Sequence, residues 1–539
     1  MVPPRPPPPL HRAATPQLHD FLDASAKRLP DKVALVTERE RLTYGALDAK
    51  ANALAHALVE DGVTRGDRVV IFGENTAETV VGFFAALKAN AVAFAVSPRT
   101  RPEKLAQHVH ETHAVALLSD MDLARAVNDG AHARHLKRVL LAGAFDARRL
   151  PAVHVAASWD EAVARGKRRA ARGGDDAPEP GGPPARRNLD VDLAALVLTA
   201  GSTGEPKRVM LSHRNLMTAT ASISTYLELR EDDVLLDVLP LTFDEGLYQV
   251  LLAFRVGARV VLERDLGEPS HVLSRIAEER VTGFAAIPPV WRALAELEDT
   301  GGVDVSSLRF LSNTSAALPL KHVARLRRLF PRAKLYTTYG LTECMRCTYL
   351  PPADLDRKPS SAGIAIPDTE LWVVDQHDER VGPGVVGQVV VRGPTVMEGY
   401  WGNPAATAQR LRPGPFPGER VLYTGDLGVL DAEGYLTLVG RIDDLIESRG
   451  EKVPPLEVEC AIANVPGVRE VAVIGVPDEL LGQAVKAFVV LEEGTTLTAR
   501  DILRECQQQL APHQVPREVE FRGALPRSPT GKVRKAQLA

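Results

Sequence analysis

A strand-like apolar run that leads directly into a loop rich in glycine and hydroxyl side chains is the feature that most restricts how this chain can fold. Residues 193–199 have the length and composition of a buried strand. Glycine lets a backbone approach an anion closely, and N–H and O–H groups can donate to it. The sequence therefore predicts a polyphosphate site in the loop that follows, with Thr199, Gly201, Ser202, Thr203, Gly204 and Lys207. It is not a Walker loop, because Pro206 precedes the lysine and Arg208 follows it.

The rest of the chain alternates apolar runs with helix-like stretches. Residues 69–72, 258–262 and 308–311 have the character of buried strands, and residues 77–88 that of a helix. This alternation predicts an α/β fold with parallel sheets covered by helices. A length of 539 residues allows about three to four domain-sized units.

Composition and residue patterns argue against nucleic-acid binding, a membrane span and a metal or redox role for the cysteines. A net charge of −4 gives no sign of nucleic-acid binding, and aromatic residues at 5% offer no stacking platform for single strands. No apolar run approaches the roughly 20 residues that a bilayer span needs, so we expect a soluble, cytoplasmic protein. The pair Cys344 and Cys347 has no second ligand pair, so we expect reduced thiols without a metal or redox role.

Two segments are expected to stay outside the packed core. Residues 1–16 are proline-rich and are not followed by the apolar segment of a signal peptide, which predicts a disordered tail. Residues 165–188 are polar and interrupted by glycine and proline, which predicts a surface loop between two subdomains. A basic docking site is the alternative interpretation of that loop.

Further motifs follow the phosphate loop along the chain. They are Tyr336–Glu343 (YTTYGLTE), Tyr423–Asp426 (YTGD), Gly440–Asp444 (GRIDD) with Glu447–Val453, and Leu525–Lys532 (LPRSPTGK). In this order and spacing, the motifs resemble the signature of the adenylate-forming superfamily. That superfamily includes acyl-CoA synthetases, adenylation domains of nonribosomal peptide synthetases and firefly luciferase.

The resemblance covers residues 17–539 and implies a domain organisation. Residues 17–442 would form a large N-terminal domain of two α/β subdomains plus a small β-barrel. Residues 443–539 would form a mobile C-terminal α+β domain that carries the catalytic lysine. Asp443 would be the hinge between the two domains.

The resemblance also implies roles for single residues. Tyr339 would stack on adenine beside Gly340, Asp426 would hold the ribose, and Arg441 would reach the nucleotide. Thr342 would contact the α-phosphate, Glu343 would bind Mg²⁺, and Lys532 would act in catalysis. Residues 399–401 (GYW) resemble the turn before the ribose aspartate and are expected to be scaffold.

The implied reaction is that of an AMP-forming acid–thiol ligase. A carboxylic acid and ATP would give acyl-AMP and pyrophosphate, and the acyl group would then pass to the thiol of CoA or of a phosphopantetheine carrier protein. Arg449 and Gly450 would line the thiol tunnel after the C-terminal domain has moved. The chain looks most like stand-alone bacterial acyl-CoA ligases, which often serve specialised pathways.

The identity of the acid stays open. The expected pocket contains Phe243, Asp244, Ser315, Ala316 and Ala317. Phe243–Asp244 resembles the pair of amino-acid-activating members, in which the aspartate meets the α-ammonium, but Gly246 replaces their usual serine. A non-amino carboxylic acid is favoured, and an amino acid loaded onto a carrier protein is the alternative. A non-catalytic nucleotide-binding scaffold is a distant one, because Glu343, Asp426 and Lys532 are all present.

The chain departs from the family pattern at three positions. Arg208 and Asn90 stand where glycine is usual, and Ala200 replaces a common serine. None of these departures removes a catalytic group.

Overall fold

The protein is described by a computed structural model over residues 15–131, 133–172, 179–199, 206–264, 267–478, 480–527 and 533–538. The predicted proline-rich tail therefore lies outside the described residues, except for its last two. Of these, Thr15 accepts hydrogen bonds from Arg186 and from the backbone of Asp190. No helix among the described residues is long and apolar enough to cross a membrane.

The first subdomain is an eight-stranded sheet in the order β19-β9-β8-β4-β3-β5-β6-β7. The strands from β8 to β7 in this order are parallel, while β9 is antiparallel to both of its neighbours, β8 and β19. Its strands are β3 (Arg68–Phe72), β4 (Val92–Val96), β5 (Ala116–Asp120), β6 (Arg138–Ala142), β7 (Ala156–Ser158), β8 (Leu193–Leu198), β9 (Arg208–Ser212) and β19 (Gly399–Tyr400). The helices of this part of the chain are α1 (Asp20–Arg28), α2 (Tyr44–Glu60), α3 (Ala77–Lys88), α4 (Pro102–Glu111), α5 (Ala124–Gly130) and α6 (Trp159–Arg172).

The second subdomain is a nine-stranded sheet in the order β16-β15-β14-β13-β12-β10-β11-β1-β2, with a parallel centre. Its strands are β1 (Val33–Val36), β2 (Arg41–Thr43), β10 (Val234–Asp237), β11 (Arg259–Leu262), β12 (Gly283–Ala286), β13 (Phe310–Asn313), β14 (Lys334–Tyr339), β15 (Thr348–Leu350) and β16 (Ile364–Ala365). Its helices are α7 (His213–Tyr226), α8 (Asp244–Val256), α9 (Pro269–Glu279), α10 (Pro288–Ala295) and α11 (Leu320–Leu329).

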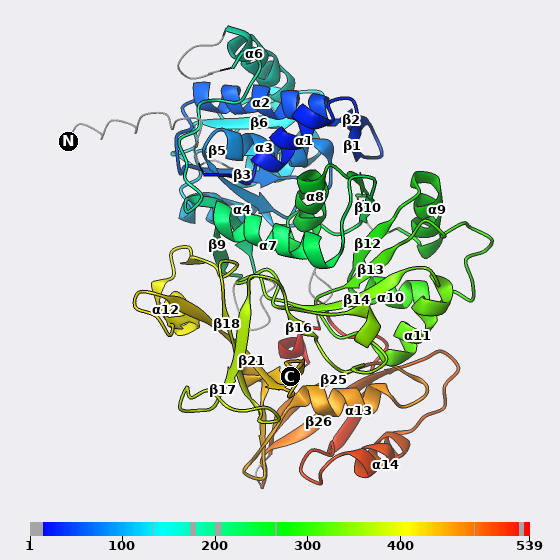
Figure 1. Ribbon diagram of the computed structural model, residues 1–539. Coiled ribbons are helices and arrows are strands. Elements are labelled where there is room, and N and C mark those ends of the chain that lie inside the picture. Colours follow the sequence, from blue (N-terminus) through cyan, green and yellow to red (C-terminus); the bar gives the residue numbers. More distant parts are fainter. Residues whose placement is uncertain are drawn as a thin grey trace.

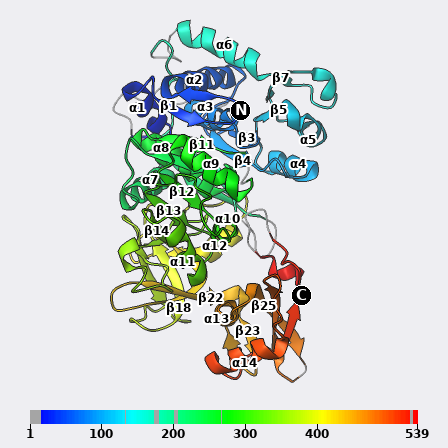
Figure 2. The same cartoon turned by 90° about the vertical axis from the view of Figure 1, so that its right-hand side faces the viewer.

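Two smaller units, built mainly of antiparallel strand pairs, complete the chain (Figures 1 and 2). The first lies where a small barrel was expected and is a five-stranded sheet of β17 (Glu370–Val374), β18 (Gly387–Arg392), β20 (Leu411–Pro413), β21 (Arg420–Leu430) and β22 (Leu436–Arg441), with α12 (Pro404–Arg410) beside it. The C-terminal unit contains β23 (Ile446–Ser448), β24 (Glu451–Val453), β25 (Val468–Asp478), β26 (Gly482–Leu491), β27 (Glu518–Phe521), α13 (Pro455–Ala463) and α14 (Ala499–Gln509). The predicted α/β class is confirmed, and both views show the C-terminal unit at one end of the molecule.

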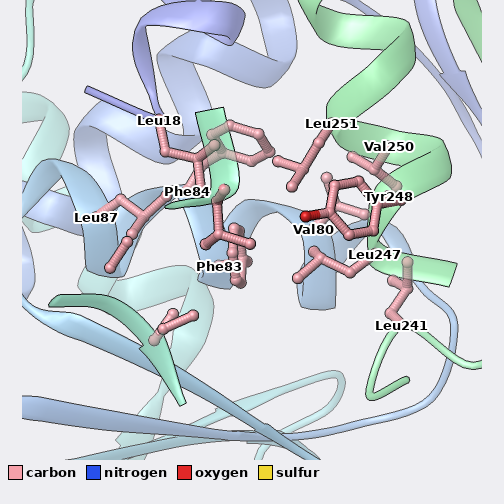
Figure 3. Packing of buried hydrophobic residues seen from close by; sticks show 14 of the residues in the cluster. Leu18, Val80, Phe83, Phe84, Leu87, Leu241, Leu247, Tyr248, Val250 and Leu251 are labelled. Atoms are coloured by element: carbon pink, nitrogen blue, oxygen red, sulfur yellow. The ribbon is translucent and has the colours of Figure 1, made fainter. Parts of the chain in front are cut away.

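One apolar cluster joins the two large subdomains. Figure 3 shows Val80, Phe83 and Phe84 of α3 facing Tyr248 and Leu251 of α8. All of these side chains are nearly inaccessible to water. Burial of apolar surface on this scale is the main favourable term in folding, so the two sheets form one body and the groups between them are held in place.

Asn90 shows how the structure accommodates one departure from the family pattern. Its φ is +62°, in the left-handed region that favours glycine but that asparagine tolerates. Its amide donates to the carbonyl of Ala185 and accepts from the N–H groups of Arg187 and Asn188. Asparagine therefore keeps the turn after α3 and also anchors the segment that leads into β8.

The expected surface loop at residues 165–188 is wrong for its first part, because α6 continues to Arg172. A helix needs only one apolar stripe to pack, and Trp159, Ala162, Gly166 and Ala170 supply it. A Cβ at Gly166 would lie 1.8 Å from the Ala53 carbonyl of α2, so glycine permits close contact of the two helices. Gly166 is thus a packing residue and does not break the helix.

Candidate active site

A cavity of about 780 Å³ lies where the two large subdomains and the small antiparallel unit meet. Its walls include the segments that follow β8, β13 and β14, together with the start of α8. The carboxyl ends of parallel strands are the usual place for ligands in such sheets. The cavity brings together segments that are far apart in the sequence, including the beginning and end of the phosphate loop at Thr199 and Lys207.

The ribose-binding candidate Asp426 lies between two partners. Tyr339 donates its hydroxyl to Asp426 Oδ2 at 2.6 Å, and Arg441 Nη1 lies 3.3 Å from Asp426 Oδ1. Burial and the Asp426 carboxylate raise the pKa of Tyr339 well above its usual value, so the tyrosine stays a donor. Arg441 lines the cavity, whereas Asp426 and Tyr339 do not, and the two contacts fix the orientation of the buried Asp426 carboxylate.

The metal-binding candidate Glu343 is held by another residue of the cavity wall. Tyr400 of β19 donates its hydroxyl to Glu343 Oε1 at 2.6 Å. The ammonium group of Lys207 lies 5.1 Å from the centre of the Tyr400 ring, within the range of a cation–π contact. The expectation that residues 399–401 are scaffold is therefore incomplete, because Tyr400 positions the carboxylate and faces the lysine. In the sequence, the only sign of this role of Tyr400 is its place in the 399–401 motif.

The phosphate loop is closed at its base. The Thr199 N–H donates to the Lys207 carbonyl at 2.9 Å, and Thr199 Oγ1 accepts from the Lys207 N–H at 3.0 Å. Gly201, Ser202, Thr203 and Gly204 lie outside the described residues. Arg208, which replaces a usual glycine, turns away toward Glu111 at 2.6 Å and His108 at 2.9 Å. The extra side chain thus lies at the cavity rim, paired with α4.

Asp244 lies on the cavity wall at the first turn of α8. Burial, and then the neighbouring Glu245, raise the pKa of Asp244 to about 6, while a hydrogen bond from Thr342 opposes the rise. A Cβ at Gly246 would lie 2.4 Å from the Pro240 carbonyl. The serine expected at this position would clash with that backbone, so the partial match to amino-acid-activating members has a steric cause.

A buried ion pair that the sequence did not reveal lies behind this wall. Arg346 bonds to Glu245 and to Thr338, and the Arg346 and Glu245 side chains are 2% and 8% exposed. The two residues are 101 positions apart, so no local pattern connects them. The pair makes the wall behind Asp244 ionic rather than apolar.

The remaining predicted residues fall into three groups. Phe243, Ser315, Gly340 and Thr342 line the cavity, Ser315 with a left-handed φ of +73°. Ala316 and Ala317 are exposed and are not on the cavity wall, since the chain turns outward after Ser315.

The predicted residues of the C-terminal part that the structure describes lie away from the cavity. Arg449 and Gly450 are exposed in the turn between β23 and β24, and Asp443 lies in a short 3₁₀ turn before β23. Lys532 lies outside the described residues.

Comparison with known proteins identifies both parts of the chain. Residues 22–401 match the AMP-binding enzyme family, and residues 457–532 match the AMP-binding enzyme C-terminal domain. The first match alone covers most of the chain.

Similar proteins are found among curated sequences and among solved structures. The chain is 30% identical to a long-chain-fatty-acid–CoA ligase of Escherichia coli O157:H7, over 97% of this chain and 94% of that one. It is 32% identical to a feruloyl-CoA synthase of an Amycolatopsis species, over 95% of this chain and 96% of that one. The ATP-bound crystal structure of MatB from Rhodopseudomonas palustris has a TM-score of 0.84 and 27% identity, over 96% of this chain and 98% of that one.

Proposed function

The chain belongs to the adenylate-forming superfamily of AMP-binding enzymes, and from this membership we propose that it is an AMP-forming ligase that joins a compact carboxylic acid to the thiol of CoA. The observation that carries the proposal is one cavity that presents a nucleotide side at Arg441, a phosphate side at Lys207 and Glu343, and an acid side at Asp244.

The proposed reaction has two steps. An oxygen of the substrate carboxylate forms a bond to the α-phosphorus of ATP, and the bond to the bridging oxygen breaks, releasing pyrophosphate. The CoA thiol then gives up its proton and attacks the acyl carbon, and AMP leaves. Positioning and charge neutralisation dominate such phosphoryl chemistry. Lys207 would hold the leaving phosphates, and Asp426 with Arg441 would orient the nucleotide.

The residues around Glu343 suit a magnesium ion. Mg²⁺ prefers oxygen ligands and is commonly bound by one or two carboxylates together with substrate phosphates. Glu343 lines the cavity, and its Oε1 is already oriented by Tyr400. When bound, the ion would neutralise negative charge on the phosphates, while Tyr400 keeps the carboxylate directed into the site.

The acid side supports a compact substrate. One void of about 10 Å³ is lined by Phe243, and a second of about 10 Å³ lies among apolar side chains of α3 and α8. A long alkyl chain needs a continuous apolar tunnel, and the wall behind Asp244 instead contains the Arg346–Glu245 ion pair. Hydrocarbon offers no polar partner to the ionised groups of this wall. We therefore propose a short or aromatic acid rather than a long-chain fatty acid.

The proposal is tested by ATP–pyrophosphate exchange with fatty, aryl and amino acids, followed by thioester formation with CoA. We expect exchange with short or aromatic acids and little with a long-chain acid. Formation of the acyl-CoA product, detected by mass spectrometry, would support CoA as the acceptor. Exchange without thioester formation would favour a carrier protein as the acceptor, and no exchange with any acid would contradict the proposal.

An amino acid is the second candidate substrate, and Asp244 favours it. Asp244 lies on the cavity wall at the start of α8, and its neighbour Glu245, not Asp244, is the partner of Arg346. An ammonium group on the substrate would pair with Asp244 and stabilise its ionised form. The carrier-protein alternative belongs with this candidate, since stand-alone amino-acid adenylating enzymes load carrier thiols.

The pH dependence of the Michaelis constant for the acid separates the two candidates. With its pKa at about 6, Asp244 is mostly neutral at about pH 5 and ionised at about pH 8. For a non-amino acid, ionisation adds a negative charge beside the incoming carboxylate, so the constant should rise as pH passes about 6 and should stay flat in Asp244→Asn. For an amino acid the constant should fall over the same range, and Asp244→Asn should raise it at about pH 8. Asp356→Asn, an exposed carboxylate paired with Arg327, is the control and should leave either profile unchanged.

A further inference from the structure

The C-terminal unit touches the N-terminal domain through ionic contacts on α10 and α11. Arg292 of α10 bonds to Glu470 of β25. Lys321 of α11 donates to the Val468 carbonyl and to Glu492, both at 2.9 Å. These contacts hold one face of the C-terminal sheet against the second subdomain.

Glu470 lies at the centre of this interface and uses each carboxylate oxygen differently. Its Oε1 bonds to Arg292 of the N-terminal domain, and its Oε2 accepts from Arg527 at 2.7 Å. Arg469 lies farther away, with its Nε 4.0 Å from Oε1. The Glu470 side chain is 9% exposed. Although burial opposes it, hydrogen bonds from Arg527 and Arg292 hold the pKa of Glu470 below its usual value, so the carboxylate stays ionised between them.

Arg527 has a particular place in the chain. It forms an antiparallel bridge with Val533, and Arg534 donates its N–H to the Pro526 carbonyl at 2.8 Å. These pairs join the two ends of the segment that contains Lys532. The apolar neighbours Leu525 and Val533 pack with Phe488 of β26. This packing attaches the two ends of the segment, which together form its base, to the C-terminal sheet.

The two arginines respond differently to a rotation of the C-terminal domain. Glu470 and Arg527 belong to the same unit, so their contact would survive the rotation at Asp443 that the family resemblance implies. Arg292 belongs to the N-terminal domain, so the same rotation would break its contact with Glu470. A contact present in only one of two orientations shifts the equilibrium toward that orientation.

We propose that Glu470 is a positioning residue for acyl-adenylate formation, because it ties Arg292 of the N-terminal domain to the base of the Lys532 segment. This inference rests on the proposed function only for the half-reaction that it names. The orientation with Arg292 on Glu470 serves the first step, and breaking that contact accompanies the second step.

Arg292→Ala tests the proposal without disturbing the Glu470–Arg527 pair. We expect ATP–pyrophosphate exchange to fall about fivefold or more, while transfer from supplied acyl-adenylate to CoA changes by less than about twofold. Arg292→Lys should restore exchange, because the contact uses a single nitrogen that an ammonium group can replace. Arg327→Ala is the matched control, since Arg327 pairs with Asp356 inside one domain.

A second measurement is independent of activity. Spin labels on Arg328→Cys of α11 and Arg504→Cys of α14, with the exposed Cys460 replaced by serine, report the distance between the domains. We expect one dominant distance in the parent protein and a broader distribution with Arg292→Ala. An unchanged distribution, or an equal loss in both half-reactions, would overturn the proposal. Absence of exchange with every acid would instead count against the proposed function and would leave the distance test valid.

Discussion

Replacing Lys532 with alanine should slow acyl-adenylate formation by about 100- to 1,000-fold, the usual cost of removing a group that stabilises charge in a transition state. The lysine would neutralise the carboxylate and phosphate oxygens as the new bond forms. Transfer from supplied acyl-adenylate to CoA should be nearly unchanged, because that step creates no new phosphate bond. Exchange of labelled pyrophosphate into ATP and single-turnover thioester formation measure the two steps separately.

Lys535→Ala is the matched control for this experiment. Lys535 is a second lysine of the same short region, and it pairs with Glu459 at 2.7 Å within the C-terminal unit. Its loss should affect both half-reactions little. An equal loss in the two variants would show that net charge, and not the position of Lys532, matters. Full exchange activity in Lys532→Ala would remove the residue from the mechanism.

Replacing Arg346 with alanine should lower the free energy of unfolding by about 3–5 kcal/mol, because it leaves the Glu245 carboxylate buried without its partner. The two side chains are 2% and 8% exposed, and Arg346 also bonds to Thr338. Equilibrium urea unfolding would measure the loss. Replacing both residues with methionine should cost less than either single alanine, since no charge then remains unpaired.

Arg327→Ala is again the useful comparison, because its pair with Asp356 is exposed at 50% and 77%. An exposed pair of this kind contributes about 0–1 kcal/mol. A similarly small effect for Arg346→Ala would mean that water reaches Glu245, and the argument for an ionic wall behind Asp244 would then fail.

Much of the fold could be predicted because its helices and strands follow from residue patterns within single segments. The helix expected at residues 77–88 has those bounds as α3, and the run at 193–199 becomes β8, Leu193–Leu198. Buried strands and amphipathic helices differ in hydrophobic period, and that period is readable in one segment at a time. The prediction failed at α6, where a narrow stripe of small residues packs a highly charged helix against α2.

The candidate site was predictable where its residues lie inside motifs. Tyr339, Glu343, Asp426 and Arg441 were expected to act on one nucleotide, and the structure brings Tyr339 and Arg441 onto Asp426. The supporting contacts were not predictable. Tyr400 meets Glu343 across 57 positions, and Glu470 meets Arg292 across 178.

The sequence by itself therefore determined the α/β class, the order of the motifs and the family of the chain, because each depends on short segments whose residue types are visible in isolation. Only the tertiary structure decided that the wall behind Asp244 is ionic, that Tyr400 holds Glu343, and that Glu470 joins the two domains. Such contacts form between segments that meet only when the sheets pack. Their energies depend on burial and distance, and neither quantity exists in a linear chain.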